Sequence, residues 1–160
     1  MQMGFSKLDN PRHEGATNTW LTPLPLVNAL GKFDLDPCAF ANHPTADKLI
    51  TLPTDGLAES WKGRVWLNPP YGKSTARWIK KLRDHGNGIA LVFSRTDTSW
   101  FHSAKPYAIF FLQGRISFLD ENFRADTNAG HGSMLLAYGH NNVLALSASG
   151  LKGTLAQVLE

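Results

Sequence analysis

Five consecutive apolar residues, Ile89–Phe93, form the segment that most limits the folds open to this chain of 160 residues. Turn residues bound the segment, so it predicts a short strand buried on both faces. Just before it, residues 75–85 predict a helix, which Ser74 can cap and Gly86 can end. The apolar face of that helix consists of Thr75, Trp78, Ile79 and Leu82. Helices that alternate with buried strands indicate an α/β domain with a mostly parallel sheet.

Further elements fit the same interpretation. A short helix is predicted over residues 24–30, because prolines occur only in its first turn. Strands are predicted over residues 33–36, 64–67 and 108–112, and a closing antiparallel hairpin over 133–138 and 143–146. We expect residues 20–160 to form a single domain, preceded by a polar, mobile arm over residues 1–19.

Composition excludes several classes of protein. A hydrophobic fraction of 42% and a charged fraction of 18% are typical of a globular protein and rule out a disordered chain. We find neither a membrane-spanning apolar segment nor a signal peptide, and Cys38 is the single cysteine. These features predict a cytoplasmic protein without an internal disulfide, in which Cys38 is a buried structural thiol. The dispersed histidines make a metal site unexpected.

Positive charge is concentrated in one segment. Eight of the 16 Lys and Arg residues lie between Trp61 and Arg95, where Asp84 is the single acid. A basic face of this kind suits a polyanion such as nucleic acid better than a membrane. The alternative is an ordinary solvated helix face.

Asn68-Pro69-Pro70-Tyr71 is the most informative motif of the sequence. Its prolines donate no hydrogen bonds and make the loop rigid, and a residue before proline is held extended. The side-chain oxygen of Asn68 and a prolyl carbonyl can then accept both hydrogens of a planar amino group, while Tyr71 stacks on the ring that carries it. Such an arrangement favours attack by the amino nitrogen on an electrophilic methyl group. The alternative is a plain proline-rich strand exit.

The order of motifs extends this interpretation. Before the tetrapeptide come Trp20-x-Thr22-Pro23, Leu35-Asp36-Pro37-Cys38-Ala39, Asp55-Gly56-Leu57 and Trp61. After it come Arg95-Thr96-Asp97-Thr98, Trp100-Phe101-His102 and Gly114-Arg115-Ile116-x-Phe118. From Trp20 to about Tyr138 the chain resembles the small phage-type DNA N-6-adenine-methyltransferases. The resemblance implies a Rossmann-like methyltransferase fold, S-adenosylmethionine as cofactor, and DNA as partner. It also implies a phage or prophage origin and a place in the bacterial host cytoplasm.

The resemblance also implies roles for individual residues. Asn68, Pro69, Pro70 and Tyr71 match the catalytic loop. The residues that match cofactor-binding positions are Thr22, Pro23, Asp36, Pro37, Ala39 and Asp55, although the loop after Asp36 lacks the glycines that many relatives carry. The basic residues next to the catalytic loop, Lys73, Arg77, Lys80 and Lys81, are expected to hold DNA phosphates. Phe118 either stacks on an extruded base or belongs to the core.

Two alternative functions remain open from the sequence. Similar tetrapeptides occur in enzymes that methylate amino groups of RNA bases or of protein glutamine. The second alternative is a nucleic-acid-binding module of the same fold that has lost catalysis, against which the intact Asn68–Tyr71 motif and the intact Asp36 argue.

Overall fold

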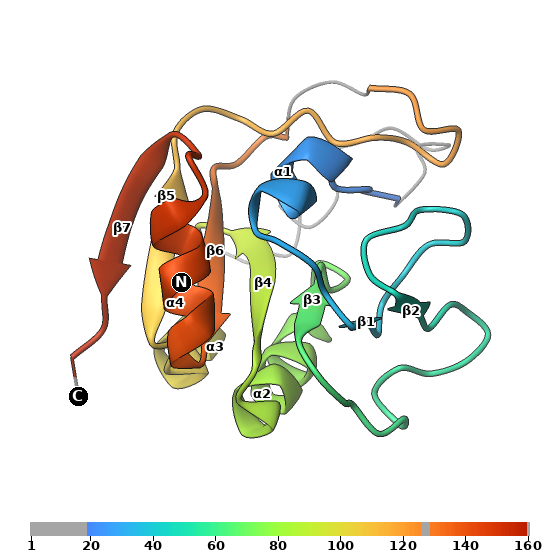
Figure 1. Ribbon diagram of the computed structural model, residues 1–160, viewed down its shortest axis with the longest axis horizontal. Coiled ribbons are helices and arrows are strands. Elements are labelled where there is room, and N and C mark those ends of the chain that lie inside the picture. The colour runs from blue at the N-terminus through green and yellow to red at the C-terminus, as the bar shows by residue number, and fades with distance from the viewer. Residues whose placement is uncertain (1–18, 126–128, 160) are drawn as a thin grey trace, which may run out of the picture.

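The computed structural model describes residues 19–125 and 129–159 (Figure 1). The arm predicted over residues 1–19 therefore lies, except for Thr19, outside the described residues. Within those residues the strands are β1 (Leu35–Asp36), β2 (Lys48–Leu49), β3 (Val65–Leu67), β4 (Gly88–Phe93), β5 (Ala108–Leu112), β6 (Ser133–Tyr138) and β7 (Gly153–Gln157). The helices are α1 (Leu24–Ala29), α2 (Thr75–His85), α3 (Ser99–Ala104) and α4 (His140–Ala148). None of these helices is long and apolar enough to cross a membrane.

The described strands form one mixed sheet in the order β2-β1-β3-β4-β6-β5-β7. The first four of these strands are parallel to their neighbours, but β6 runs antiparallel to both β4 and β5, and β7 runs antiparallel to β5. The prediction of a mostly parallel sheet is therefore wrong, because half of the pairings are antiparallel. The described chain has no helix between β5 and β6. Two neighbouring strands that are joined without a crossover connection run antiparallel to each other.

The predicted closing hairpin is wrong as well, because residues 143–146 lie in α4. Val143 and Leu146 are three positions apart, so both fall on one helical face, and both are buried. Asn142 anchors the first turn of this helix, since its side-chain nitrogen donates to the carbonyl of Tyr138 at 2.7 Å. A short apolar run fits a helix or a strand equally well, and here the tertiary contacts decide.

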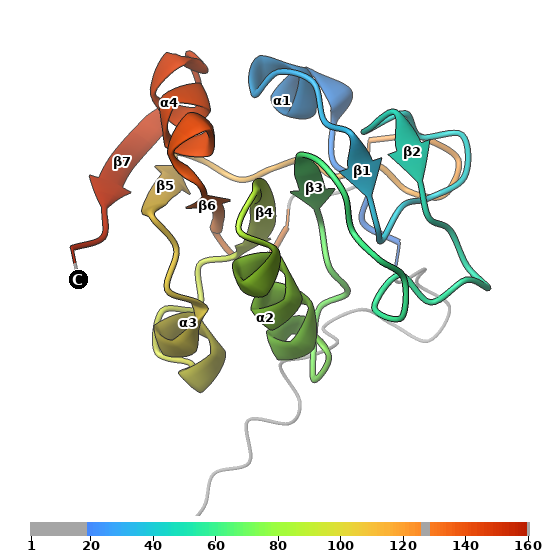
Figure 2. The same cartoon turned by 60° about the horizontal axis from the view of Figure 1, so that its bottom comes forward.

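Helices cover both faces of the sheet, with α1 and α4 on one side and α2 and α3 on the other (Figure 2). Along β4, Ile89 and Leu91 pack toward α1 and α4, whereas Ala90 and Val92 pack toward α2 and α3. The predictions of a doubly buried strand and of the buried face of α2 are both confirmed. Gly86 ends α2 in a left-handed conformation, but the Ser74 side chain makes no capping hydrogen bond.

The parallel part of the sheet places two motifs side by side. From β1 the chain moves outward to β2 and then crosses to the other side of β1 to form β3. The order of strands therefore reverses between β1 and β3, and ligands of α/β sheets bind beyond the carboxyl ends of strands at such a point. Asp36-Pro37 ends β1 and Asn68 follows β3.

Candidate active site

The side-chain amide of Asn68 is held in one orientation. Its nitrogen donates to the main-chain carbonyl of Trp20 at 2.7 Å and to the hydroxyl of Thr22 at 3.2 Å. A carbonyl oxygen can only accept, so the amide nitrogen must face Trp20. The amide oxygen therefore faces the other way, with the hydroxyl of Tyr71 at 3.5 Å. At that distance the contact is weak, so another donor can displace it at little cost.

The rest of the motif is fixed to α2. The hydroxyl of Thr75, in the first turn of that helix, donates to the carbonyl of Pro70 at 2.8 Å. Because the Pro70 carbonyl already accepts this bond, the carbonyl of Pro69 is the better candidate for the second acceptor beside Asn68. Pro69 itself is buried, whereas Pro70 is exposed.

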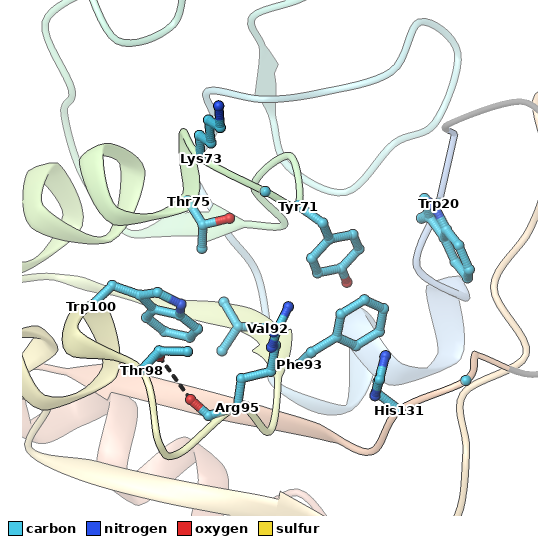
Figure 3. A pocket seen from close by; sticks show the side chains of 12 residues that line it. Trp20, Tyr71, Lys73, Thr75, Val92, Phe93, Arg95, Thr98, Trp100 and His131 are labelled. Carbon is cyan, nitrogen blue, oxygen red and sulfur yellow. Dashed lines mark hydrogen bonds between the residues drawn. The ribbon is translucent and has the colours of Figure 1, made fainter. Parts of the chain in front are cut away.

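A cavity of about 270 Å³ opens beside the motif (Figure 3). Aromatic rings dominate its walls, with Trp100 on one side and Tyr71 and Phe93 on the other (Figure 3). The lining residues are Trp20, Tyr71, Gly72, Lys73, Thr75, Val92, Phe93, Arg95, Thr98, Trp100, Gly130 and His131. The cavity lies at the carboxyl ends of β3 and β4 and can hold a flat, electron-rich ring.

The aromatic side chains around the cavity support one another. Tyr71 stacks on Phe93 with 4.0 Å between ring centroids, and burial raises the pKa of the Tyr71 hydroxyl, which stays protonated. Trp20 meets Tyr71, Phe93 and Phe118 edge-on at 6.2, 6.1 and 5.4 Å. Phe118 is 1% exposed, so the structure places it in the core, one of the two roles open from the sequence.

Asp36 is buried and its carboxylate is used within its own loop. One oxygen accepts from the main-chain N–H of Cys38 at 3.0 Å, and the other accepts from the hydroxyl of Thr45. Burial raises the pKa of Asp36 to about 6. Asp36 thus shapes the loop after β1. Desolvation and the nearby Asp36 charge raise the pKa of Cys38 to about 12, as expected of an unreactive thiol. Cys38 is partly buried, whereas the sequence predicted a buried thiol.

The loop after β1 also touches the segment that contains Asp55. A Cβ atom on Gly56 would lie 1.8 Å from the carbonyl oxygen of Pro37, so only glycine allows this packing. Asp55 itself is exposed, and one of its carboxylate oxygens accepts from the N–H of Leu57 at 2.9 Å. The structure therefore brings Pro37 next to Gly56, the neighbour of Asp55. None of the six positions predicted to bind a cofactor lines the 270 Å³ cavity.

The basic residues near the motif divide into two groups. Lys73 and Arg77 are exposed, and Lys73 borders the cavity. Lys81 instead donates to the carbonyls of Leu57 and Glu59 at 2.6 and 2.5 Å. Lys80 is exposed but pairs with Asp84 at 2.6 Å. Phosphate contacts are therefore better supported for Lys73 and Arg77 than for Lys80 and Lys81.

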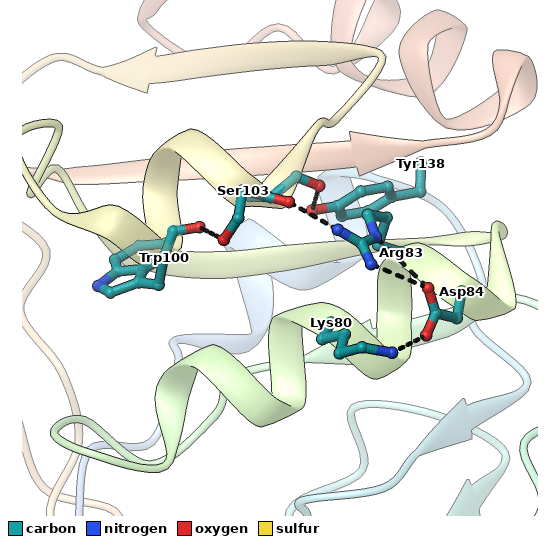
Figure 4. Close-up of polar contacts among 7 residues, drawn as sticks. Lys80, Arg83, Asp84, Trp100, Ser103 and Tyr138 are labelled. Atoms are coloured by element: carbon teal, nitrogen blue, oxygen red, sulfur yellow. Dashed lines mark hydrogen bonds and ion pairs between the residues drawn. The ribbon is translucent and has the colours of Figure 1, made fainter.

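Polar contacts between α2 and α3 hold one wall of the cavity (Figure 4). Arg83 donates to the carbonyl of Ser103 at 2.8 Å, and the Ser103 hydroxyl donates to the carbonyl of Trp100 at 3.1 Å. The hydroxyl of Tyr138, on β6, donates to the carbonyl of Ala104 at 2.8 Å. These bonds fix α3, which carries Trp100, against α2 and the sheet.

Sequence reasoning missed most of the cavity wall. Phe93 could have been identified, because it is the last residue of a buried strand whose carboxyl end lies beside the motif. Trp20 belongs to the motif Trp20-x-Thr22-Pro23, but the motif alone gave it no role in the site. Trp100 lies in a segment that continues the family resemblance, but the sequence assigned it no role in the site. His131 carries no local signal, since only the tertiary fold brings it to the cavity.

Comparison with known proteins gives a consistent result. Residues 11–146 match the family described as DNA N-6-adenine-methyltransferase (Dam). The chain is also similar to the DNA N-6-adenine-methyltransferase of Escherichia phage T1, with 30% identity over 119 residues that cover 64% of this chain and 49% of the phage protein. The chain thus spans about half the length of that relative. No solved structure matches it.

Proposed function

Because this chain belongs to the DNA N-6-adenine-methyltransferase (Dam) family, we propose that it transfers a methyl group from S-adenosylmethionine to the exocyclic N6 amino group of adenine in DNA. One observation carries the proposal: the Asn68 amide is fixed by Trp20 and Thr22 with its oxygen facing away from both. An acceptor held in this way is suited to an N–H donor and rejects a carbonyl.

The chemistry follows from two acceptors. One N–H of the target amino group donates to the Asn68 side-chain oxygen and the other to the Pro69 carbonyl. Holding both hydrogens keeps the nitrogen lone pair directed at the methyl group and raises its electron density. When bound, S-adenosylmethionine would supply an electrophilic methyl group, whose bond to sulfur breaks as its bond to nitrogen forms. The methylated nitrogen would then lose one of its two protons.

We place the methyl donor on the surface over β1. The segment after Asp55 packs on Pro37 so closely that Gly56 has no space for a side chain, and the two segments form one surface at the reversal of strand order. Pro37, Ala39 and Asp55 would hold the donor there, next to Thr22 and Pro23. Asp36 would act indirectly, because its carboxylate accepts from the Cys38 N–H and so fixes the loop after β1. The same strand reversal supports a Rossmann-like arrangement of β2, β1, β3 and β4.

The cavity suits the target base. An adenine amino group is out of reach inside a duplex, so the base must leave the stack. A cavity of about 270 Å³ with aromatic walls has room for one flat ring system. In this arrangement the base stacks on Tyr71, and Lys73 and Arg77 contact phosphates beside the cavity.

The test is methyl transfer from radiolabelled S-adenosylmethionine to unmodified DNA, followed by nucleoside analysis. We expect label in N6-methyladenine, and a loss of roughly 10²-fold or more in the Asn68→Ala variant. Affinity for S-adenosylmethionine should stay within a few-fold of wild type, and Asn141→Ala, an exposed asparagine of α4, should be fully active.

Parallel reactions with RNA and with a glutamine peptide separate the alternative substrates. Label in either of these and none in DNA would replace the proposed substrate. A wild-type protein that labels none of the three would favour an inactive nucleic-acid-binding module. An Asn68→Ala variant with the wild-type rate would refute the mechanism.

A further inference from the structure

We propose that Thr22 is a positioning residue for Asn68, which it holds with its acceptor oxygen directed at the target amino group. This inference rests on the proposed function and changes the role that the family resemblance implies for Thr22, which is to hold the cofactor. The contact that carries it is the hydrogen bond from the Asn68 amide nitrogen to the Thr22 hydroxyl at 3.2 Å.

A side-chain amide needs two contacts to keep one orientation. The Trp20 carbonyl, at 2.7 Å, determines which end of the amide is nitrogen, because a carbonyl cannot face an amide oxygen. One contact still allows the group to rotate about its axis. The Thr22 hydroxyl accepts from the same nitrogen and restrains that rotation, so both N–H groups are used and the oxygen is left for substrate.

Thr22 is itself held rigidly. It is 1% exposed, and because it precedes Pro23 its backbone is restricted to extended conformations. Its carbonyl accepts from the ring of His43 at 2.8 Å. The preceding residue, Leu21, exchanges main-chain hydrogen bonds with Leu119 at 2.9 and 2.8 Å. A support fixed on several sides can define the position of a catalytic group within a fraction of an ångström.

The position of Thr22 explains why its effect should pass through Asn68. Thr22 does not line the 270 Å³ cavity, so it is not expected to touch the target base. Its hydroxyl accepts a hydrogen bond from Asn68, and its carbonyl accepts one from His43. Loss of the hydroxyl should therefore slow methyl transfer and leave binding of DNA and of S-adenosylmethionine nearly unchanged.

The experiment compares Thr22→Val, which removes the hydroxyl and keeps the shape, with Thr22→Ser, which keeps the hydroxyl. We expect the valine variant to reduce the single-turnover rate by about 5- to 20-fold, the size of effect of one lost hydrogen bond to a catalytic group. The serine variant should recover the rate to within about twofold. Both dissociation constants should stay within about threefold of wild type.

A double-mutant cycle separates positioning from general damage. If Thr22 acts through Asn68, then Thr22→Val should have no further effect on the residual activity of Asn68→Ala. Thermal unfolding of each variant controls for folding, and Thr22→Ala serves as the second hydroxyl-deleting variant if the valine variant fails to fold.

Three results would overturn the inference. The first is weaker S-adenosylmethionine binding by Thr22→Val with an unchanged rate at saturation, which would assign Thr22 to the donor. The others are a fully active Thr22→Val variant and an additive loss in the Asn68→Ala background. Failure of the proposed function is distinct, because it appears as an inactive wild-type protein or a fully active Asn68→Ala variant.

Discussion

The rings of Tyr71 and Phe93 lie nearly parallel, with centroids 4.0 Å apart and planes inclined by 13°. One face of the tyrosine proposed to hold the target base is therefore already covered by a side chain of β4. A base that stacks on the other face would extend this pair into a stack of three rings. Phe93 supports Tyr71 in that role and limits the base to one side of it.

Removal of either ring should weaken productive capture of the base. We expect Tyr71→Ala to raise the DNA concentration needed for half-maximal single-turnover methylation by about 5- to 150-fold, since stacking on a base is worth about 1–3 kcal/mol. Tyr71→Phe should keep much of the activity, because the ring face provides the stacking. Phe93→Ala should have a smaller effect of the same kind.

The matched control for these ring deletions is Tyr107→Ala. Tyr107 is 56% exposed and precedes β5, away from the cavity. Its removal should leave the DNA dependence unchanged. If Tyr71→Ala matches this control, Tyr71 does not stack on the target base.

Two exposed cations should carry the salt dependence of DNA binding. Lys73 borders the cavity, and Arg77 lies one turn further along on the exposed face of α2. If each contacts one phosphate, alanine at either position should lower the slope of log affinity against log salt concentration by about one. Fluorescence anisotropy with labelled DNA at several salt concentrations measures these slopes.

Two other lysines provide controls for this prediction. Lys105→Gln, at the exposed residue that follows α3, should leave the slope unchanged. Lys81→Ala should mainly lower the melting temperature, because Lys81 holds the Leu57 and Glu59 carbonyls. A wild-type slope near zero would mean that this face of α2 is an ordinary solvated surface.

The buried carboxylate of Asp36 should make stability depend on pH. Its pKa is raised from 3.8 to about 6, so between these values the folded protein holds a proton that the unfolded chain has lost. The free energy of unfolding contributed by Asp36 is fully present below pH 4 and is lost as the pH rises through about 6. The full difference corresponds to about 3 kcal/mol as an upper limit.

Asp36→Asn should remove this dependence. The amide oxygen can accept from the Cys38 N–H, and the amide nitrogen can donate to the Thr45 hydroxyl, so the loop keeps both bonds without a buried charge. Denaturant unfolding at about pH 4.5 and about pH 7.5 should show a smaller decline for this variant than for wild type. Asp55→Asn, at an exposed site, is the control, and equal declines in Asp36→Asn and wild type would contradict the prediction.

Residue spacing within one segment predicts those helices and strands whose buried faces depend on that spacing alone. The spacing of Trp78, Ile79 and Leu82 is enough to define the buried face of α2, and the apolar run of β4 is enough to define a doubly buried strand. The helix α4 and the direction of β6 were missed. Both depend on which element lies next to which, and a run such as residues 143–146 does not carry that information.

The candidate site likewise has one part that the sequence predicts and another that only the fold brings together. The motif Asn68–Tyr71 indicates a rigid pair of acceptors, because proline geometry is a local property. The partner of Asn68 is Thr22, which lies 46 positions away in the sequence, and only the fold pairs them. Asp36 stays a predicted cofactor-binding residue, and the sequence could not reveal that Cys38 and Thr45 donate to its two oxygens.

The position of β6 has a consequence for synthesis of the chain. This strand lies in the interior of the sheet, between β4 and β5, although it comes after both in the sequence. Until residue 138 has left the ribosome, the backbone groups of β4 that pair with β6 have no partner, and Leu91 and Val92 lack its packing. Such an open, apolar strand edge is prone to aggregate, and pairings between distant segments form slowly. We therefore expect nascent chains that end before β6 to depend on chaperones, and the cavity to form only once β6 is inserted.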